Sequence, residues 1–143
     1  MSGEHDEKRV VRGALPWPST LPLTIVRFAM LFGVLGFGAA AYVMARGGTQ
    51  PEAAPATLRA LQYAGFALLA VSAGATLVLR SRLSETRDEA KQRTLCIIGY
   101  ALGETPALLG GVVWILGGGP MLYAAALVVF ILAIVVLAPR ADE

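Results

Sequence analysis

Apolar and polar positions divide the chain into four long apolar blocks, separated by short segments that are polar or rich in glycine and proline. Each block approaches or exceeds the roughly 20 residues that a helix needs to cross a bilayer. Apolar runs of this length are typical of membrane helices and not of strands. We therefore expect an all-α polytopic membrane protein with four transmembrane helices. The predicted spans cover residues 21–44, 58–79, 94–116 and 121–137.

The spans are expected to form one transmembrane domain at residues 21–140, with a polar N-terminal tail at 1–20 and a C-terminal stub at 141–143. The last two spans are joined only by Gly117-Gly118-Gly119-Pro120, so they must be antiparallel neighbours. We expect the four spans to pair as two helical hairpins.

Basic residues are distributed unevenly between the two sides that a four-span chain defines. One side holds only Arg46 and Arg59. The positive-inside rule places the other side, with both termini, in the cytoplasm. The usage of Ala, Gly and Arg is compatible with a bacterium of high genomic GC content, so we expect a multi-pass inner-membrane protein. The other side carries Lys8, Arg9, Arg12, Arg80, Arg82, Arg87, Lys91, Arg93 and Arg140.

The first block also has features of a secretory signal peptide, because basic residues precede it and small residues follow. Acidic residues in the preceding segment, among them Glu4 and Asp6, and the length of the block argue against cleavage. We expect an uncleaved first span.

Composition narrows the function classes further. With 143 residues, 56% of them hydrophobic, the spans leave no room for a soluble catalytic domain. A net charge of +2 is too small for a nucleic-acid binder. Cys96 is the one cysteine and His5 the one histidine, so neither an internal disulfide nor a His/Cys metal site is expected. We predict no cofactor and no metal, and the partners are membrane lipid and other membrane subunits or further copies.

Glu104 is the outstanding candidate for chemistry. It lies about 11 residues into the third span, roughly 16 Å along the helix, near the middle of the hydrocarbon. A charged carboxylate there is costly, so it should face protein or water, or be protonated. One interpretation is a proton or cation site, and the other is a protonated side chain that hydrogen-bonds across the bundle.

Arg27 and Tyr100 are the candidate partners of this carboxyl. Arg27 lies about one helical turn from Glu104 in depth, because spans 1 and 3 run in the same direction. Its guanidinium either reaches Glu104 or extends back to the cytoplasmic headgroups. Tyr100 precedes Glu104 by one turn on the same face and is placed to donate a hydrogen bond to it.

Pro106 predicts a helix kink beside the acid. It removes the hydrogen bond to the carbonyl of Leu102, which is then free to bind a cation or water. Thr105 can donate to the carbonyl of Ala101 and ease the kink. The alternative is a packing bend without a ligand.

Local signals predict further packing and helix ends. Thr57 is placed to cap the second helix and Ser84 to cap the third, and Glu89 and Arg93 form a favourable i,i+4 pair. Small residues allow close helix packing in lipid. The predicted packing positions are Gly33, Gly36, Ala64, Gly74, Gly103, Ala107 and Gly110.

The segment from Arg93 to Val113 resembles the carboxylate helix of the rotary ATP synthase proteolipid (c subunit), since Glu104 is followed six residues later by Gly110 in an apolar run. That resemblance implies an ion-binding role for Glu104. The acid, however, opens the second hairpin here, and Pro106 is foreign to the motif. The whole chain resembles small, uncharacterised bacterial four-helix membrane proteins, through Ala101, Glu104, Ala107, Leu108 and Gly110, which implies no known activity.

Two functions follow as expectations. The first is a non-catalytic integral membrane protein, either an accessory subunit of a membrane assembly or a self-associating one. The second is proton or cation translocation through an oligomer that uses Glu104. We expect no enzyme, because no nucleophile, base and orienting group converge in the sequence.

Overall fold

A computed structural model describes residues 23–48 and 53–138, and this part of the chain is almost entirely helical, without strands. The fold class predicted from the sequence is thus confirmed as all-α. The predicted tail at 1–20 and stub at 141–143 lie outside the described residues. The helices are α1 (Leu23–Arg46), α2 (Pro55–Glu85), α3 (Glu89–Val113), the short π-helical turn η1 (Trp114–Gly118) and α4 (Met121–Val136).

Three of these helices are long and apolar enough to cross a membrane: α1, α2, and α3 continued by η1. The fourth, α4, is also apolar but has only 16 residues. At 1.5 Å per residue it is about 24 Å long, somewhat less than a hydrocarbon core of about 30 Å. α2 has 31 residues and is about 46 Å long, so it is longer than the same core requires.

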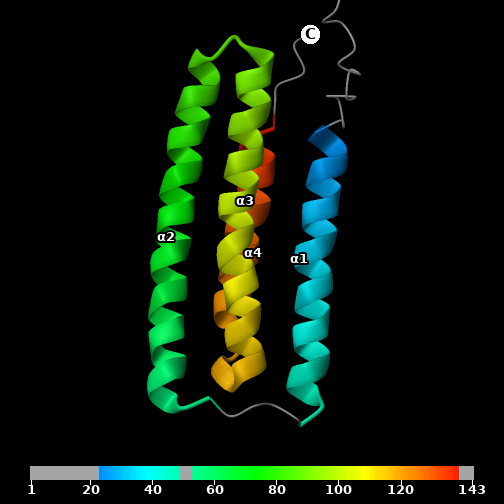
Figure 1. The fold of residues 1–143 in the computed structure, drawn as a ribbon, viewed down its shortest axis with the longest axis vertical. Coiled ribbons are helices and arrows are strands. Elements are labelled where there is room, and N and C mark those ends of the chain that lie inside the picture. Colours follow the sequence, from blue (N-terminus) through cyan, green and yellow to red (C-terminus); the bar gives the residue numbers. More distant parts are fainter. Residues whose placement is uncertain (1–22, 49–52, 139–143) are drawn as a thin grey trace, which may run out of the picture.

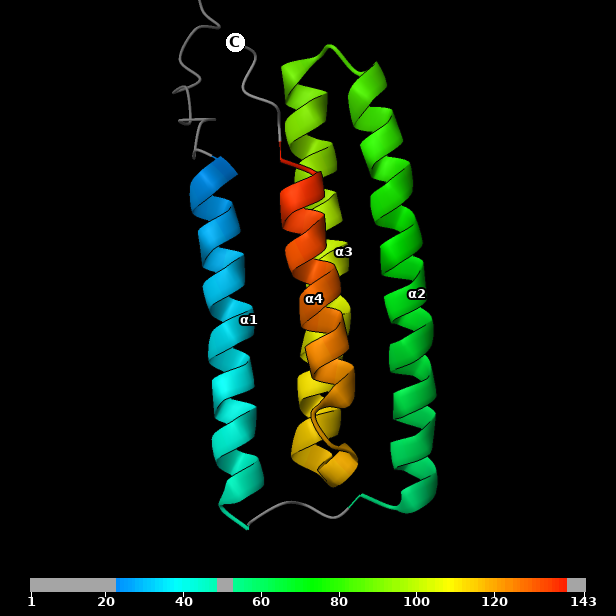
Figure 2. The same ribbon diagram turned by 180° about the vertical axis from the view of Figure 1, so that it is seen from behind.

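The helices surround a central pair. α3 packs most extensively against α4 and then against α2, and the two views show α1 and α2 on opposite sides of the α3–α4 pair (Figures 1 and 2). The start of α1, the α2–α3 connection (residues 86–88) and the end of α4 lie at one end of the bundle, which we call the connection end (Figure 1). The Gly117–Pro120 turn lies at the other, the turn end.

α2 begins earlier than its sequence suggests. Its first residue is Pro55, preceded by Ala54, and no side chain caps it. The prediction that Thr57 caps this helix is therefore wrong. Proline has a fixed φ that suits the first turn, and the N–H it lacks would have had no helical partner there.

α3 is capped by a residue that the sequence reading passed over. The Asp88 carboxylate accepts hydrogen bonds from the backbone N–H groups of Ala90 (3.0 Å) and Lys91 (3.5 Å). Ser84, the predicted cap, lies instead in the last turn of α2 and donates to the carbonyl of Ser81. Asp88 is better placed because α2 stays helical through the charged segment and leaves only residues 86–88 between the helices.

The predicted pair of Glu89 and Arg93 is confirmed. Arg93 Nη2 lies 2.5 Å from Glu89 Oε1 in the first turns of α3. Both helices that meet at the connection carry charge at that end, whereas the middle of α2 is apolar and that of α3 is apolar apart from Glu104.

The turn between α3 and α4 depends on glycine. Gly117 and Gly119 have φ angles of 90° and 78°, a region that residues with a Cβ rarely adopt. Pro120 then precedes α4 directly. This compact reversal brings α3 and α4 side by side, as Figure 2 shows.

The core lies between α3 and α4 and is closed on one side by α1. A Cβ at Gly110 would lie 2.7 Å from the backbone of Tyr123, so only glycine allows this approach. Tyr123 itself reaches across to α1, where its hydroxyl donates to the carbonyl of Val34 at 2.8 Å. The fully buried side chains include Val34, Tyr100, Ala107, Ala126, Phe130 and Ala133.

Candidate functional site

Arg27 and Tyr100 form the main polar contact between α1 and α3. The Nε of Arg27 donates a 2.7 Å hydrogen bond to the Tyr100 hydroxyl, and its guanidinium carbon lies 5.4 Å from the centre of the ring. This position combines a hydrogen bond with a cation–π contact. The Nη2 of Arg27 is buried and has no hydrogen-bond partner among the described residues.

Tyr100 also contacts the end of α4. Its hydroxyl lies 3.4 Å from the carbonyl oxygen of Leu137, and the thiol of Cys96 donates to the same oxygen at 3.2 Å. The last carbonyls of a helix lack helical partners and carry its partial negative charge. Tyr100 and Cys96 therefore converge where α4 is most electronegative, with Arg27 bound to Tyr100, and Cys96 is buried there.

Glu104 stands apart from this cluster. Its side chain is partly exposed, and it forms no hydrogen bond or ion pair with any residue in the described part of the chain. The structure therefore brings Arg27 and Tyr100 together but does not bring either to Glu104. The reason is that Arg27 lies level with Tyr100 and finds the phenol oxygen and its ring there, one turn before it would reach the carboxyl.

The carbonyl freed by Pro106 is occupied by a side chain of α2. Ser72 Oγ donates to the Leu102 oxygen at 2.5 Å, so the group considered as a cation ligand already has a partner. Thr105 Oγ1 donates to the Ala101 carbonyl at 2.8 Å, as the sequence predicts. Pro106 is buried inside a helix that remains continuous from Glu89 to Val113. The local arrangement is that of a packed proline whose lost hydrogen bond is replaced.

Sequence reasoning missed Ser72 and its neighbour Thr76. Both are buried, and Thr76 Oγ1 donates to the backbone carbonyl of Ser72 at 2.9 Å. A usable signal was present, because a hydroxyl residue in one apolar span is a natural donor for a carbonyl that proline frees in the next. Tyr123, which joins α4 to α1, was missed in the same way.

The predicted packing positions fall into two groups. Gly103, Ala107 and Gly110 of α3 are buried inside the bundle. The positions on α1 and α2 instead lie on outward faces: Gly33, Gly36 and Gly74 have nothing within 4 Å of where a Cβ would stand, and Ala64 is exposed. Further glycines outside that set also make close contacts with neighbouring side chains: Gly38, Gly65, Gly99, Gly111 and Gly118.

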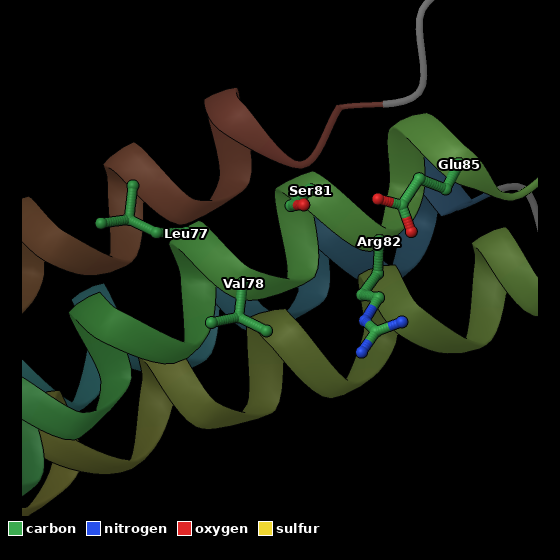
Figure 3. A pocket seen from close by; sticks show the side chains of 5 residues that line it. All are labelled: Leu77, Val78, Ser81, Arg82 and Glu85. Carbon is green, nitrogen blue, oxygen red and sulfur yellow. The ribbon is translucent and has the colours of Figure 1, made fainter.

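The remaining surface features give weaker evidence for a binding site. A shallow depression near the end of α2 is lined by Leu77, Val78, Ser81, Arg82 and Glu85. All five lie along one helix, and Figure 3 shows no convergence of their polar groups. At the turn end, Gln62 Nε2 donates to the Gly118 carbonyl at 3.1 Å and ties α2 to η1.

The described residues contain no group of three or more His, Cys, Asp or Glu side chains placed to hold a metal. Comparison of the chain with protein-family models, with curated proteins and with solved structures gave no match. Its function is therefore argued from the geometry of the bundle.

Proposed function

We propose that this chain is a non-catalytic, multi-pass protein of a bacterial inner membrane that acts as a self-associating or accessory subunit of a membrane assembly. The observation that carries the proposal is the open glycine face of α1. Gly33 and Gly36 leave the backbone bare, whereas most other helical glycines of the described chain are in contact with a neighbouring helix or turn. Small residues at such positions allow a further helix to approach closely in lipid.

The polar groups inside the bundle support a structural role. Ser72, Thr76, Cys96 and Tyr123 all donate to backbone carbonyls. The bonds of Ser72, Cys96 and Tyr123 join one helix to another, whereas that of Thr76 lies within α2. These groups are not arranged as a nucleophile with a base and an orienting residue.

The orientation in the membrane is part of the same proposal. In the described chain, Arg80, Arg82, Arg87, Lys91 and Arg93 lie toward the connection end, whereas Arg46 and Arg59 lie toward the turn end. By the positive-inside rule the connection end faces the cytoplasm, and with it both termini. In this placement α4 crosses the membrane despite its 16 residues, since local thinning of the bilayer accommodates a short span.

Native mass spectrometry of the purified chain in mild detergent tests the proposal. We expect particles that contain more than one chain, or the chain together with another membrane protein. The double variant Gly33→Leu/Gly36→Leu should release single chains, because leucine fills the open face. Gly74→Leu is the matched control for a contact made by α1, because Gly74 is an equally open glycine on α2. A wild-type chain that is always single and without a partner would contradict the proposal.

A second candidate, proton or cation translocation through an oligomer, is favoured by one observation. Glu104 is the acidic residue placed deep within a span, and it has no partner among the described residues. An acid within a transmembrane segment marks an ion pathway by default. Liposomes containing the chain should then show a proton or cation flux that Glu104→Gln abolishes. A hydrophobic carbodiimide should modify Glu104 in the wild type, and absence of labelling at every pH would exclude this candidate.

A further inference from the structure

Glu104 and the open glycines of α1 lie on the same side of the bundle. On α1, Val34 and Gly38 meet Tyr123 of α4, and Phe37 meets Gly111 of α3. On a helical wheel of α1, with 100° per residue, the α3 contact follows the α4 contacts. The next positions in the same direction are Gly33, Ala40, Ala29 and Gly36. The open glycines therefore face away from α4.

The same construction places the carboxyl. On α3, Gly103 and Gly110 meet α4, whereas Tyr100 and Gly111 meet α1. On a helical wheel of α3, the α1 contacts follow the α4 contacts, and Glu104 is the next position in the same direction. Figure 1 shows this side of α3 toward the viewer, with α4 behind it. Glu104 and Gly33 thus share the side of the α1–α3 pair that is remote from α4.

They also lie at similar depth. Arg27 contacts Tyr100 and Phe37 contacts Gly111. Residues of α1 and α3 at the same depth therefore differ by 73 or 74 positions in the sequence. Glu104 is therefore level with Met30 and Leu31, less than one helical turn from Gly33. We call this surface the Glu104 face, which comprises Gly33, Gly36, Ala40, Ala101, Glu104 and Leu108.

We propose that the Glu104 face is the contact between two copies of this chain related by a twofold axis along the membrane normal, with the two Glu104 carboxyl groups hydrogen-bonded to each other across it. The inference rests on the proposed self-association and names its occupant and its central residue. It is carried by the unpaired carboxyl, and the bare α1 backbone beside it gives the second copy room to approach.

The chemistry of the carboxyl selects a second copy. In a protonated pair, each carboxyl is both donor and acceptor, so the group is complementary to itself. In a twofold contact the same patch meets itself, and two copies inserted in the same orientation bring Glu104 to the same depth. The other residues of the face are apolar, and no described residue of the same chain pairs with Glu104. A copy supplies the missing partner that makes an acid at this depth tolerable.

The test measures dimer dissociation in bilayers by diluting labelled chains in lipid and counting chains per particle. Glu104→Leu should weaken the dimer about 5- to 30-fold, the range expected for interhelical hydrogen bonds in lipid. Glu104→Gln keeps a donor and an acceptor and should stay within a few-fold of the wild type. Gly33→Leu should weaken the dimer as well, whereas Gly74→Leu, on α2, should not.

Cross-linking gives an independent measurement. In a Cys96→Ala background, Glu104→Cys should form a disulfide with its copy on mild oxidation, whereas Leu132→Cys on the exposed side of α4 should not. A wild-type dimer that Glu104→Leu leaves unchanged, or that Glu104→Gln weakens as much as Glu104→Leu, would overturn the paired carboxyls and leave self-association standing. A wild-type chain that stays single at every density would overturn the twofold contact, and the face would then belong to a helix of another protein.

Discussion

The hydroxyl of Ser72 replaces the hydrogen bond that Pro106 removes from the carbonyl of Leu102. Two residues 34 positions apart thus repair one defect, the donor coming from α2 and the defect lying in α3. A backbone carbonyl left unpaired in an apolar bundle is costly, so the serine and the proline should be energetically coupled.

We predict that Ser72→Ala lowers the free energy of unfolding by about 0.5–2 kcal/mol, because Leu102 then lacks a donor. The same change should cost less in a Pro106→Ala background, where the backbone N–H of residue 106 can bond to Leu102. A double-mutant cycle in detergent, followed by circular dichroism, measures the coupling. Ser81→Ala, at an exposed position on the same helix, is the control. Equal costs in both backgrounds would show that the hydroxyl serves another purpose.

Tyr100→Phe should destabilise the chain by about 1–3 kcal/mol, because it leaves Arg27 Nε and the Leu137 carbonyl without this partner. Unfolding in a denaturing detergent gives the value. Tyr63→Phe, at a tyrosine that is 75% exposed, should change little.

Exchanging the charges, with Arg27→Glu and Glu104→Arg in one chain, should not restore the stability lost in either single variant. The reason is that Arg27 binds Tyr100 and not Glu104. Unfolding of the three variants and the wild type gives the coupling free energy directly. A rescue by the double exchange would mean that the two charges meet in the folded protein after all.

Glycines inside and outside the bundle should respond in opposite ways to alanine. Gly110→Ala should destabilise the fold by about 1–3 kcal/mol, since its Cβ would meet the backbone of Tyr123 and the helices must part. Gly74→Ala should be neutral or stabilise by up to about 1 kcal/mol, because the site is open and alanine favours the helix. Thermal unfolding of both variants and the wild type makes the comparison. Similar losses at both positions would show that the close approach of Gly110 to Tyr123 is not the cause of its cost.

The proposed orientation predicts which side of the membrane each connection faces. In a Cys96→Ala background, Arg87→Cys at the connection end should react with an impermeant thiol reagent only when the cytoplasmic side is exposed. Ala56→Cys, at the turn end, should react in intact cells after the outer membrane is permeabilised. The opposite pattern would reverse the topology.

The sequence could predict the helices because their apolar length is a property of each segment alone. It also predicted the Thr105 hydrogen bond and the Glu89–Arg93 pair, whose partners lie four residues apart on the same helix. These interactions need no knowledge of which helices are neighbours. The predicted cap at Thr57 failed for a local reason, since Pro55 is itself a good first residue of a helix.

Which helices pack against each other could not be predicted from the sequence. A face that packs against protein and one that contacts lipid are equally apolar, so Gly36 and Gly110 look alike in the sequence although only Gly110 meets another helix. For the same reason the choice of Arg27 between Tyr100 and Glu104 could not be made, because it depends on how α1 sits beside α3. The hydroxyl of Ser72 became meaningful only when Leu102 lay opposite it.

The hydrogen bond from Tyr123 of α4 to Val34 of α1 joins residues that are 89 positions apart in the sequence. α1 leaves the ribosome first, yet the surfaces on which it rests, in α3, η1 and α4, are made last. During synthesis, which proceeds from the N-terminus, α1 is therefore inserted before the helices against which it packs. A chain cut short before Tyr123 would retain the Arg27 contact with Tyr100 on α3 but lose the hydrogen bond from Tyr123 to Val34, so α1 would be held on one side only.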